Sequence, residues 1–164
     1  MTLERLWAGW RSSYVSNIPA DDDGGCVLCR LAAAENDEAA LVLERTATTI
    51  TVMNLYPYGS GHLMTAPIRH VASIEDLTED EATELTRAQV RAVRAIRSAY
   101  GPDGVNLGAN LGQAAGAGIP GHLHVHVLPR WSGDTNFMTA VAEVRVLPES
   151  LPDGYRKLVA VWPR

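Results

Sequence analysis

The stretch GHLHVHVLPRW, Gly121 to Trp131, places three of the five histidines of this chain at alternating positions. Side chains of a β-strand point alternately to its two faces, so a strand here puts His122, His124 and His126 on one face and apolar side chains on the other. Neighbours on the same face are then roughly 6–7 Å apart. The pattern predicts a row of imidazoles on one side of a sheet whose other side is buried.

Three roles are open to such a row: metal ligands, nucleophilic and acid–base catalysis, or histidines held by local hydrogen bonds without chemistry. Imidazoles are costly to bury unless each has a partner, so three on one face indicate a function. The glycine-rich segment NLGQAAGAGIPG runs directly into this strand. Backbone N–H groups of such a loop can approach an anion closely, which favours a phosphate held beside a nucleophilic imidazole.

Composition narrows the class of protein. The 164 residues are 46% hydrophobic and 20% charged, which is typical of one soluble globular domain. A net charge of −5 argues against nucleic-acid binding. No apolar run approaches the roughly 20 residues of a membrane span. Glu4 and Arg5 lie where a signal peptide would be apolar, so we expect a cytoplasmic protein.

The order of predicted elements indicates an α+β fold with an antiparallel sheet. The clearest element is a long helix that begins after Thr78, where Glu81 completes a capping box, and ends at Gly101 and Pro102. A short helix is expected from Cys26 and another within residues 148–162. Strands are expected over residues 41–44, 49–53, 62–66, 105–110 and 122–128.

The segment HLHVHVL resembles the signature of the histidine triad (HIT) superfamily of nucleotide hydrolases and transferases, in which three histidines alternate with apolar residues. The resemblance extends to NLYPYGSGHLMTAP and to residues 105–130. It implies a HIT-like fold of about five antiparallel strands, one long helix and a short C-terminal helix. A single HIT domain would span residues 1–164, with an arm and loop at 1–25, a core at 26–135 and an extension at 136–164.

The resemblance also implies roles for individual residues. His124 would attack the α-phosphorus and form a nucleotidyl-histidine intermediate, with His126 at the scissile phosphate and leaving group, and with His122 as the third catalytic histidine. A nucleophilic imidazole must be neutral, and its other nitrogen needs an acceptor such as a backbone carbonyl. The substrate contacts implied on the same ground are Asn110, Gly116 and Gly118 for phosphate, and Asn54 for the nucleoside. We interpret His62 as structural, or as hydrogen-bonded near the nucleoside pocket.

Cys26 and Cys29, the two cysteines of the chain, form one CxxC. A redox pair, a disulfide, free thiols and zinc ligation are the alternatives. The first normally follows a strand in a thioredoxin-like unit, and the second is rare in the cytosol. The resemblance implies a structural zinc site completed by His70 and His122, and no organic cofactor. Four Cys and His ligands are a common zinc set.

Two further segments, LERLWAGWRSSYV and PRWSGDTNFM, resemble bacterial HIT proteins related to diadenosine tetraphosphate phosphorylases and hydrolases. This implies an enzyme that cleaves a dinucleoside polyphosphate, resolves the intermediate with water or phosphate, and forms a homodimer. Arg130 would meet the distal phosphates, and Trp131 would line the pocket or pack in the core. The alternatives are a nucleoside phosphoramidase or other nucleoside-monophosphate hydrolase, and a nucleotide-binding regulatory protein.

Overall fold

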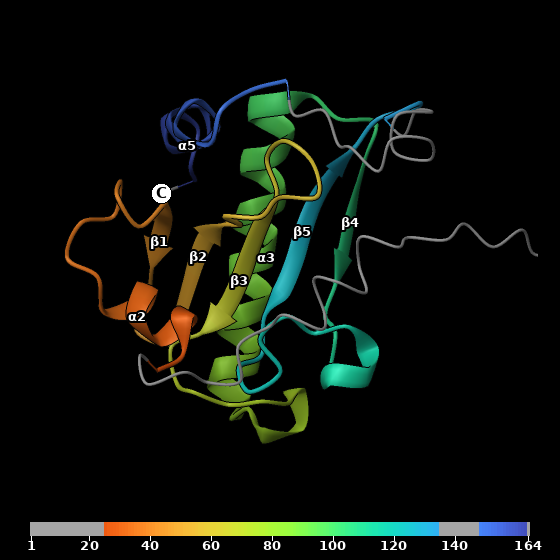
Figure 1. Ribbon diagram of the computed structural model, residues 1–164. Helices are drawn as coiled ribbons and strands as arrows, with labels where there is room; N and C mark the ends of the chain where they lie inside the picture. The colour runs from red at the N-terminus through yellow and green to blue at the C-terminus, as the bar shows by residue number, and fades with distance from the viewer. Residues whose placement is uncertain (1–24, 135–147, 164) are drawn as a thin grey trace, which may run out of the picture.

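A computed structural model describes residues 25–134 and 148–163 (Figure 1). Its strands form one five-stranded sheet in the order β1-β2-β3-β5-β4, and every neighbouring pair is antiparallel. The strands are β1 (Val42–Arg45), β2 (Thr49–Met53), β3 (Leu63–Pro67), β4 (Gly104–Gly108) and β5 (Val125–Arg130). The helices are α2 (Val27–Ala33), α3 (Glu79–Tyr100) and α5 (Leu151–Ala160), with 3-10 turns η1 (Ile74–Asp76) and η2 (Gln113–Ala115). The predicted α+β fold is confirmed.

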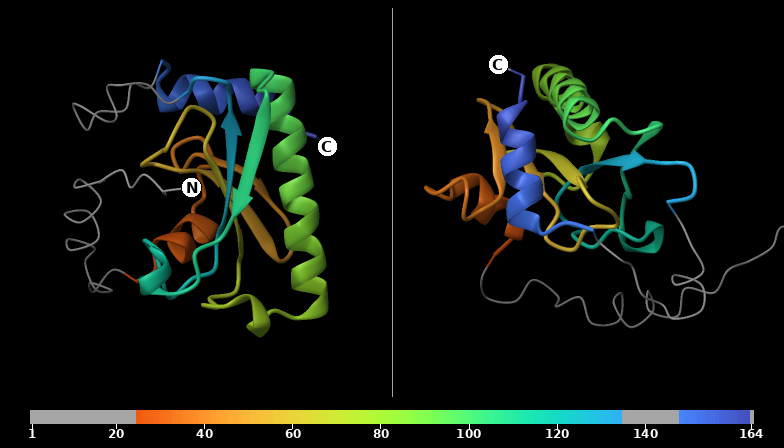
Figure 2. Two further views of the ribbon diagram at one scale, coloured as in Figure 1. Left: turned by 90° about the vertical axis from the view of Figure 1, so that its right-hand side faces the viewer. Right: turned by 90° about the horizontal axis from the view of Figure 1, so that it is seen from above.

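Helices cover the sheet on both sides, as Figure 2 shows. On one face α3 and α5 bury a cluster that includes Leu63, Ile96 and Leu158. On the opposite face, called here the α2 face, Leu28 of α2 packs against β1, β2 and β3. Strands β2 and β3 are therefore buried along their whole length, because each has a helix on either side.

The long helix begins as the sequence predicts. The Thr78 hydroxyl accepts from Glu81 N–H at 3.2 Å, and the Glu81 carboxylate accepts from Thr78 N–H at 2.9 Å, which closes the capping box. The same carboxylate accepts from Arg69 Nε and Nη2 at 2.8 and 2.7 Å. These bonds lower the pKa of Glu81 to about 2. They also tie the start of α3 to the segment that follows β3.

The histidine strand begins later than predicted. β5 starts at Val125 rather than at His122, because β3 ends at Pro67, which has no N–H for the ladder. Leu123 N–H instead donates to Val71 O at 2.6 Å. The predicted end at residue 128 is also wrong, since β5 continues through Pro129 to Arg130. Pro129 is tolerated because β3 pairs no further than Val127, so β5 has only β4 beside it there.

The ends of the chain are described in part. The N-terminal arm predicted at residues 1–25 lies almost entirely outside the described residues. The short C-terminal helix is present as α5, and its Tyr155 and Leu158 pack in the same core as α3. Among the described residues, no helix is both long and apolar enough to cross a membrane. The domain boundaries stay a prediction.

Candidate functional site

The sheet register places two of the three histidines on the α2 face. His126 lies opposite Met64 of β3, whose side chain packs in the cluster under α2. His124 precedes β5 by one residue and is 4% exposed. The His124 and His126 rings lie 5.1 Å apart at 85° to one another. The alternating pattern therefore brings these two imidazoles into direct contact.

The proton position on His124 follows from its partner. His124 Nδ1 lies 2.8 Å from the main-chain carbonyl oxygen of His122. A carbonyl only accepts, so Nδ1 carries the proton and Nε2 carries a lone pair. His124 is thus held in the tautomer that a nucleophile requires, and the acceptor that the sequence analysis called for is the carbonyl of His122.

His126 is oriented by a residue that the sequence analysis did not connect with it. Tyr58 N–H lies 3.0 Å from His62 Nδ1, which makes that nitrogen an acceptor. His62 Nε2 then carries the proton and donates it to His126 Nδ1 at 2.9 Å. His126 consequently carries its own proton on Nε2. The only sequence signal for this contact is the predicted strand start at His62.

Burial controls the charge of His126. Removal from water, together with the nearby His124, lowers the pKa of His126 to about 4. His126 is therefore neutral at pH 7 and offers a hydrogen bond from Nε2 rather than a positive charge. The site combines an unprotonated nitrogen on His124 with an N–H donor on His126.

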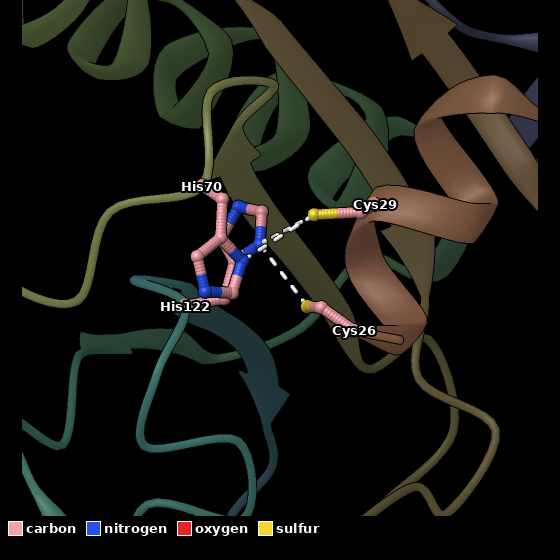
Figure 3. A group of neighbouring side chains, drawn as sticks. All are labelled: Cys26, Cys29, His70 and His122. Carbon is pink, nitrogen blue, oxygen red and sulfur yellow. Dashed lines mark hydrogen bonds between the residues drawn. The ribbon is translucent and has the colours of Figure 1, made fainter. Parts of the chain in front are cut away.

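The third histidine, His122, belongs to a cluster at the N-terminus of α2. Cys26 and Cys29, at the start of this helix, face His70 and His122, as Figure 3 shows. The ligand atoms of the four residues all lie within 4.8 Å of one another. His122 Nδ1 is 3.2 Å from Cys26 Sγ and 3.5 Å from Cys29 Sγ, and His70 Nδ1 is 3.4 Å from Cys29 Sγ.

These separations fit one tetrahedral metal ion. With Zn–S near 2.3 Å and Zn–N near 2.0–2.1 Å, tetrahedral angles place sulfur and nitrogen about 3.5 Å apart. His122 Nε2 lies 2.8 Å from Pro67 O and must donate to it, which leaves the Nδ1 lone pair facing the thiols. A carbonyl behind a ligating imidazole is the usual outer partner of a zinc ligand. Burial lowers the pKa of His122 and raises that of Cys29.

The loop residues expected to bind phosphate lie before the histidines. Asn110 Nδ2 donates to Gly116 O at 3.3 Å, so this amide holds the loop in shape. Gly116 has φ of 90°, a left-handed conformation that a side chain would strain, and Gly118 lies further along the same loop. Asn54 follows β2, accepts from Tyr56 N–H at 3.0 Å, and places Nδ2 3.4 Å from His62 Nδ1. Asn54 thus contacts the imidazole that orients His126.

Two predicted substrate contacts have partners of their own. The Arg130 guanidinium binds the Asp134 carboxylate at 2.6 and 2.7 Å and Asn106 Oδ1 at 2.9 Å. Trp131 packs edge-on against Tyr100, with ring centroids 6.3 Å apart. Arg130 lies four positions after His126 along the strand, which is roughly 13 Å. The contacts described for these two residues do not include a histidine.

Residues 34–133 match the HIT domain family. An AP-4-A phosphorylase of Mycobacterium tuberculosis is 40% identical over 99% of this chain and 86% of its own length. An asymmetrical bis(5'-nucleosyl)-tetraphosphatase of Schizosaccharomyces pombe is 33% identical over 57% of this chain and 50% of its own. A solved structure of a Zn-bound histidine triad family protein from Mycobacterium smegmatis superposes with a TM-score of 0.67 at 25% identity, covering 83% of this chain and 91% of that one.

The residues matched to this family contain the whole five-stranded sheet and the pair of His124 and His126. The chain belongs to the HIT domain family. Its relatives class it with the enzymes of that family, the hydrolases and transferases.

Proposed function

We propose that this protein cleaves a phosphoanhydride bond of a dinucleoside polyphosphate by transferring a nucleotidyl group to His124. The observation that carries the proposal is the set of hydrogen bonds that gives the neighbouring His124 and His126 rings complementary tautomers. In the neutral imidazoles, the His122 carbonyl leaves the lone pair of His124 at Nε2, and the donor on His62 leaves the proton of His126 at Nε2. The proposal draws its substrate class from two relatives, which are named as an AP-4-A phosphorylase and a bis(5'-nucleosyl)-tetraphosphatase.

In the first step, His124 Nε2 attacks the α-phosphorus. A P–N bond forms, the P–O bond to the remaining polyphosphate breaks, and the electron pair leaves on oxygen. The His124 imidazole keeps its Nδ1 proton and becomes cationic. The His122 carbonyl, 2.8 Å from Nδ1, then accepts a charge-assisted hydrogen bond that is stronger than in the ground state.

His126 is proposed to contact the phosphate oxygens and the leaving group. Its Nε2–H donates a hydrogen bond to oxygen atoms on which negative charge develops. Because the low pKa of His126 keeps it neutral, it stabilises charge without transferring a proton. A polyphosphate leaves as a stable anion and does not need a proton from His126. Asn110, Gly116 and Gly118 are proposed as further phosphate contacts, Asn54 as the nucleoside contact, and Arg130 and Trp131 as more distant ones.

In the second step, an oxygen nucleophile attacks the phosphorus of nucleotidyl-His124. The P–N bond breaks, and its electron pair returns to Nε2 as the neutral imidazole. Attack by water releases a nucleoside monophosphate and one proton to solvent, whereas attack by inorganic phosphate releases a nucleoside diphosphate. The relative with 40% identity is named a phosphorylase, which favours phosphate.

Zinc is proposed as a structural ion held by Cys26, Cys29, His70 and His122. All four positions are protein ligands, so none remains open for a water molecule. The ion would tie α2 to the segments that precede β5. Support comes from the donor separations and from the Zn-bound relative of similar fold.

The test of the proposed reaction is product analysis. The protein is incubated with diadenosine tetraphosphate, with and without phosphate, beside a His124→Ala variant. ADP and ATP formed only with phosphate indicate a phosphorylase, and AMP and ATP formed in both conditions indicate a hydrolase. An active His124→Ala variant would overturn the mechanism.

Inactivity of the wild type in both conditions would overturn the substrate assignment. The next substrates would then be AMP-linked amines, because a phosphoramidase differs only in its leaving group. Nucleotide binding without turnover on either substrate would favour the regulatory alternative.

We also propose a homodimer in the cytoplasm. β4 is an outer strand of the sheet, and Leu107 on it is 51% exposed, which suits a partner. Light scattering of the wild type and of Leu107→Lys tests this. A dimer that becomes a monomer on substitution supports it, and a wild-type monomer refutes it.

A further inference from the structure

We propose that the cluster of Cys26, Cys29, His70 and His122, when it holds a metal ion, acts as a positioning device for the nucleophile. Metal occupancy would decide whether His124 keeps its reactive tautomer. This inference rests on the proposed function, because it assigns a regulatory role to the proposed zinc site. It goes further because Cys26 and Cys29, as metal ligands, would then help to determine the rate of nucleotidyl transfer.

One residue joins the two sites. The ring of His122 faces the thiols with Nδ1, at 3.2 Å from Cys26 Sγ. The main-chain carbonyl of the same His122 accepts the Nδ1 proton of His124 at 2.8 Å. A displacement of His122 therefore moves the acceptor that fixes the proton on His124. Only one residue lies between the proposed metal ligand and the nucleophile.

His122 is restrained from the β3 side without help from the metal. Its Nε2 donates to Pro67 O at 2.8 Å, and Leu123 N–H donates to Val71 O at 2.6 Å. On the α2 side, the ring faces the two thiols and His70, which are weak partners until they ligate an ion. A shared ion replaces these weak contacts by bonds that fix the ring from the second side.

Small movements suffice to change the chemistry. A displacement of 1 Å at a reacting group can cost on the order of 100-fold in rate, and loss of an outer-shell partner typically costs about 10–100-fold. We therefore expect removal of the metal to slow the formation of nucleotidyl-His124 by about 10–100-fold. Nucleotide binding should change by less than about threefold, because Asn54, after β2, and Asn110, after β4, are not part of the cluster.

The decisive measurement is the ¹⁵N spectrum of the histidine rings. Long-range ¹H–¹⁵N correlation distinguishes a proton on Nδ1 from one on Nε2, and a His124→Gln spectrum assigns the signal. Protein loaded with Zn²⁺ should show His124 in the Nδ1–H form. After treatment with EDTA, it should show a mixture of tautomers, and added Zn²⁺ should restore the single form. A His124 signal that stays in the Nδ1–H form without metal would overturn the proposal.

Variants separate this effect from loss of the fold. His70→Ala removes a ligand on another segment, and it should reproduce the mixed tautomers at limiting Zn²⁺. The matched control is Arg91→Gln, which breaks bonds to Glu44 and Glu84 on the side of the sheet that carries β1. Its His124 spectrum should remain that of the wild type. A shift as large in Arg91→Gln as in His70→Ala would show general loosening and overturn the proposal.

Kinetics and binding complete the test. Single-turnover formation of nucleotidyl-His124 is compared in loaded and metal-free protein, and AMP binding is measured by calorimetry on both. A slower step with unchanged AMP binding supports positioning, whereas equal rates in both forms refute it. Should the loaded protein not react with diadenosine tetraphosphate at all, the proposed function fails. The ¹⁵N spectra still decide whether the metal controls the tautomer of His124.

Discussion

Replacing Leu28 with alanine is expected to weaken zinc binding about 100-fold, although Leu28 is not a ligand. Leu28 lies between Cys26 and Cys29, is 0% exposed, and is the buried residue of α2. A helix of seven residues does not hold itself together in water, so its docking depends on this side chain. Truncating a buried leucine to alanine costs about 2–5 kcal/mol.

If zinc binds only when α2 is docked on the sheet, the free energy lost in docking is also lost from zinc binding. A loss of about 3 kcal/mol in docking, at 1.4 kcal/mol per factor of ten, corresponds to roughly 100-fold. Competition with a chromophoric chelator measures the zinc affinity, and urea unfolding measures the stability of each variant.

Leu158→Ala is the matched control. Leu158 is also 0% exposed, but it packs from α5 on the opposite face of the sheet. Its substitution should cost a similar free energy of unfolding and change the zinc affinity by less than about threefold. An equal loss of zinc affinity in both variants, or a wild-type zinc affinity in Leu28→Ala, would refute the coupling between docking of α2 and zinc binding.

Three further predictions concern other contacts. His62→Phe should lower kcat by about 10–100-fold with little change in KM, because a ring without N–H removes the donor that fixes the tautomer of His126; steady-state kinetics test this. Thr65→Val should leave urea stability unchanged or raise it by about 1 kcal/mol, since this buried hydroxyl has no hydrogen-bond partner among the described residues. Stability should fall as the pH drops from about 4.5 towards 2, because the pKa of Glu81 is about 2 when folded and ordinary when unfolded; Glu81→Gln should flatten this dependence.

Each of these has an outcome that contradicts it. A wild-type kcat in His62→Phe would show that His62 does not position His126. Thr49→Val is the control for Thr65→Val, because the equally buried Thr49 hydroxyl is bonded to Thr46 Oγ1 at 2.9 Å. Equal destabilisation of the two variants would contradict the analysis of buried hydroxyls. If the stability of Glu81→Gln falls with decreasing pH as steeply as that of the wild type, other carboxylates cause the loss.

Local chemistry made much of the fold predictable. The capping box at Thr78 and Glu81 and the left-handed Gly101 are formed as predicted at the two ends of α3. The alternating histidines fixed which side chains share a face, and the structure brings His124 and His126 together. Cys26 and Cys29 meet His70 and His122 within 4.8 Å, but the sequence pattern alone left four alternatives open, and the resemblance supplied the partners.

The remaining features depend on contacts between residues far apart in the sequence, and these contacts could not be predicted. The contact of His62 with His126 joins residues 64 positions apart, and it exists only because β3 pairs with β5. The ion pair between Arg130 and Asp134 was also missed, although the two residues are only four positions apart. The turn that brings the Asp134 carboxylate back to Arg130 has no periodic pattern in the sequence. The start of β5 depended on how Pro67 ends the neighbouring strand, which no pattern within the histidine segment reveals.

The place of β5 in the sheet has a consequence for synthesis on the ribosome. Among the residues that the structure describes, β5 is the last strand of the sheet in sequence order but lies between β3 and β4, so a nascent chain that ends before residue 125 presents two unpaired strand edges. Such edges favour aggregation. The strand that joins the two halves of the sheet also carries His126 and follows directly on His124. The pair of His124 and His126 is therefore assembled in the same step that covers these edges, and premature termination products expose the edges without forming the pair.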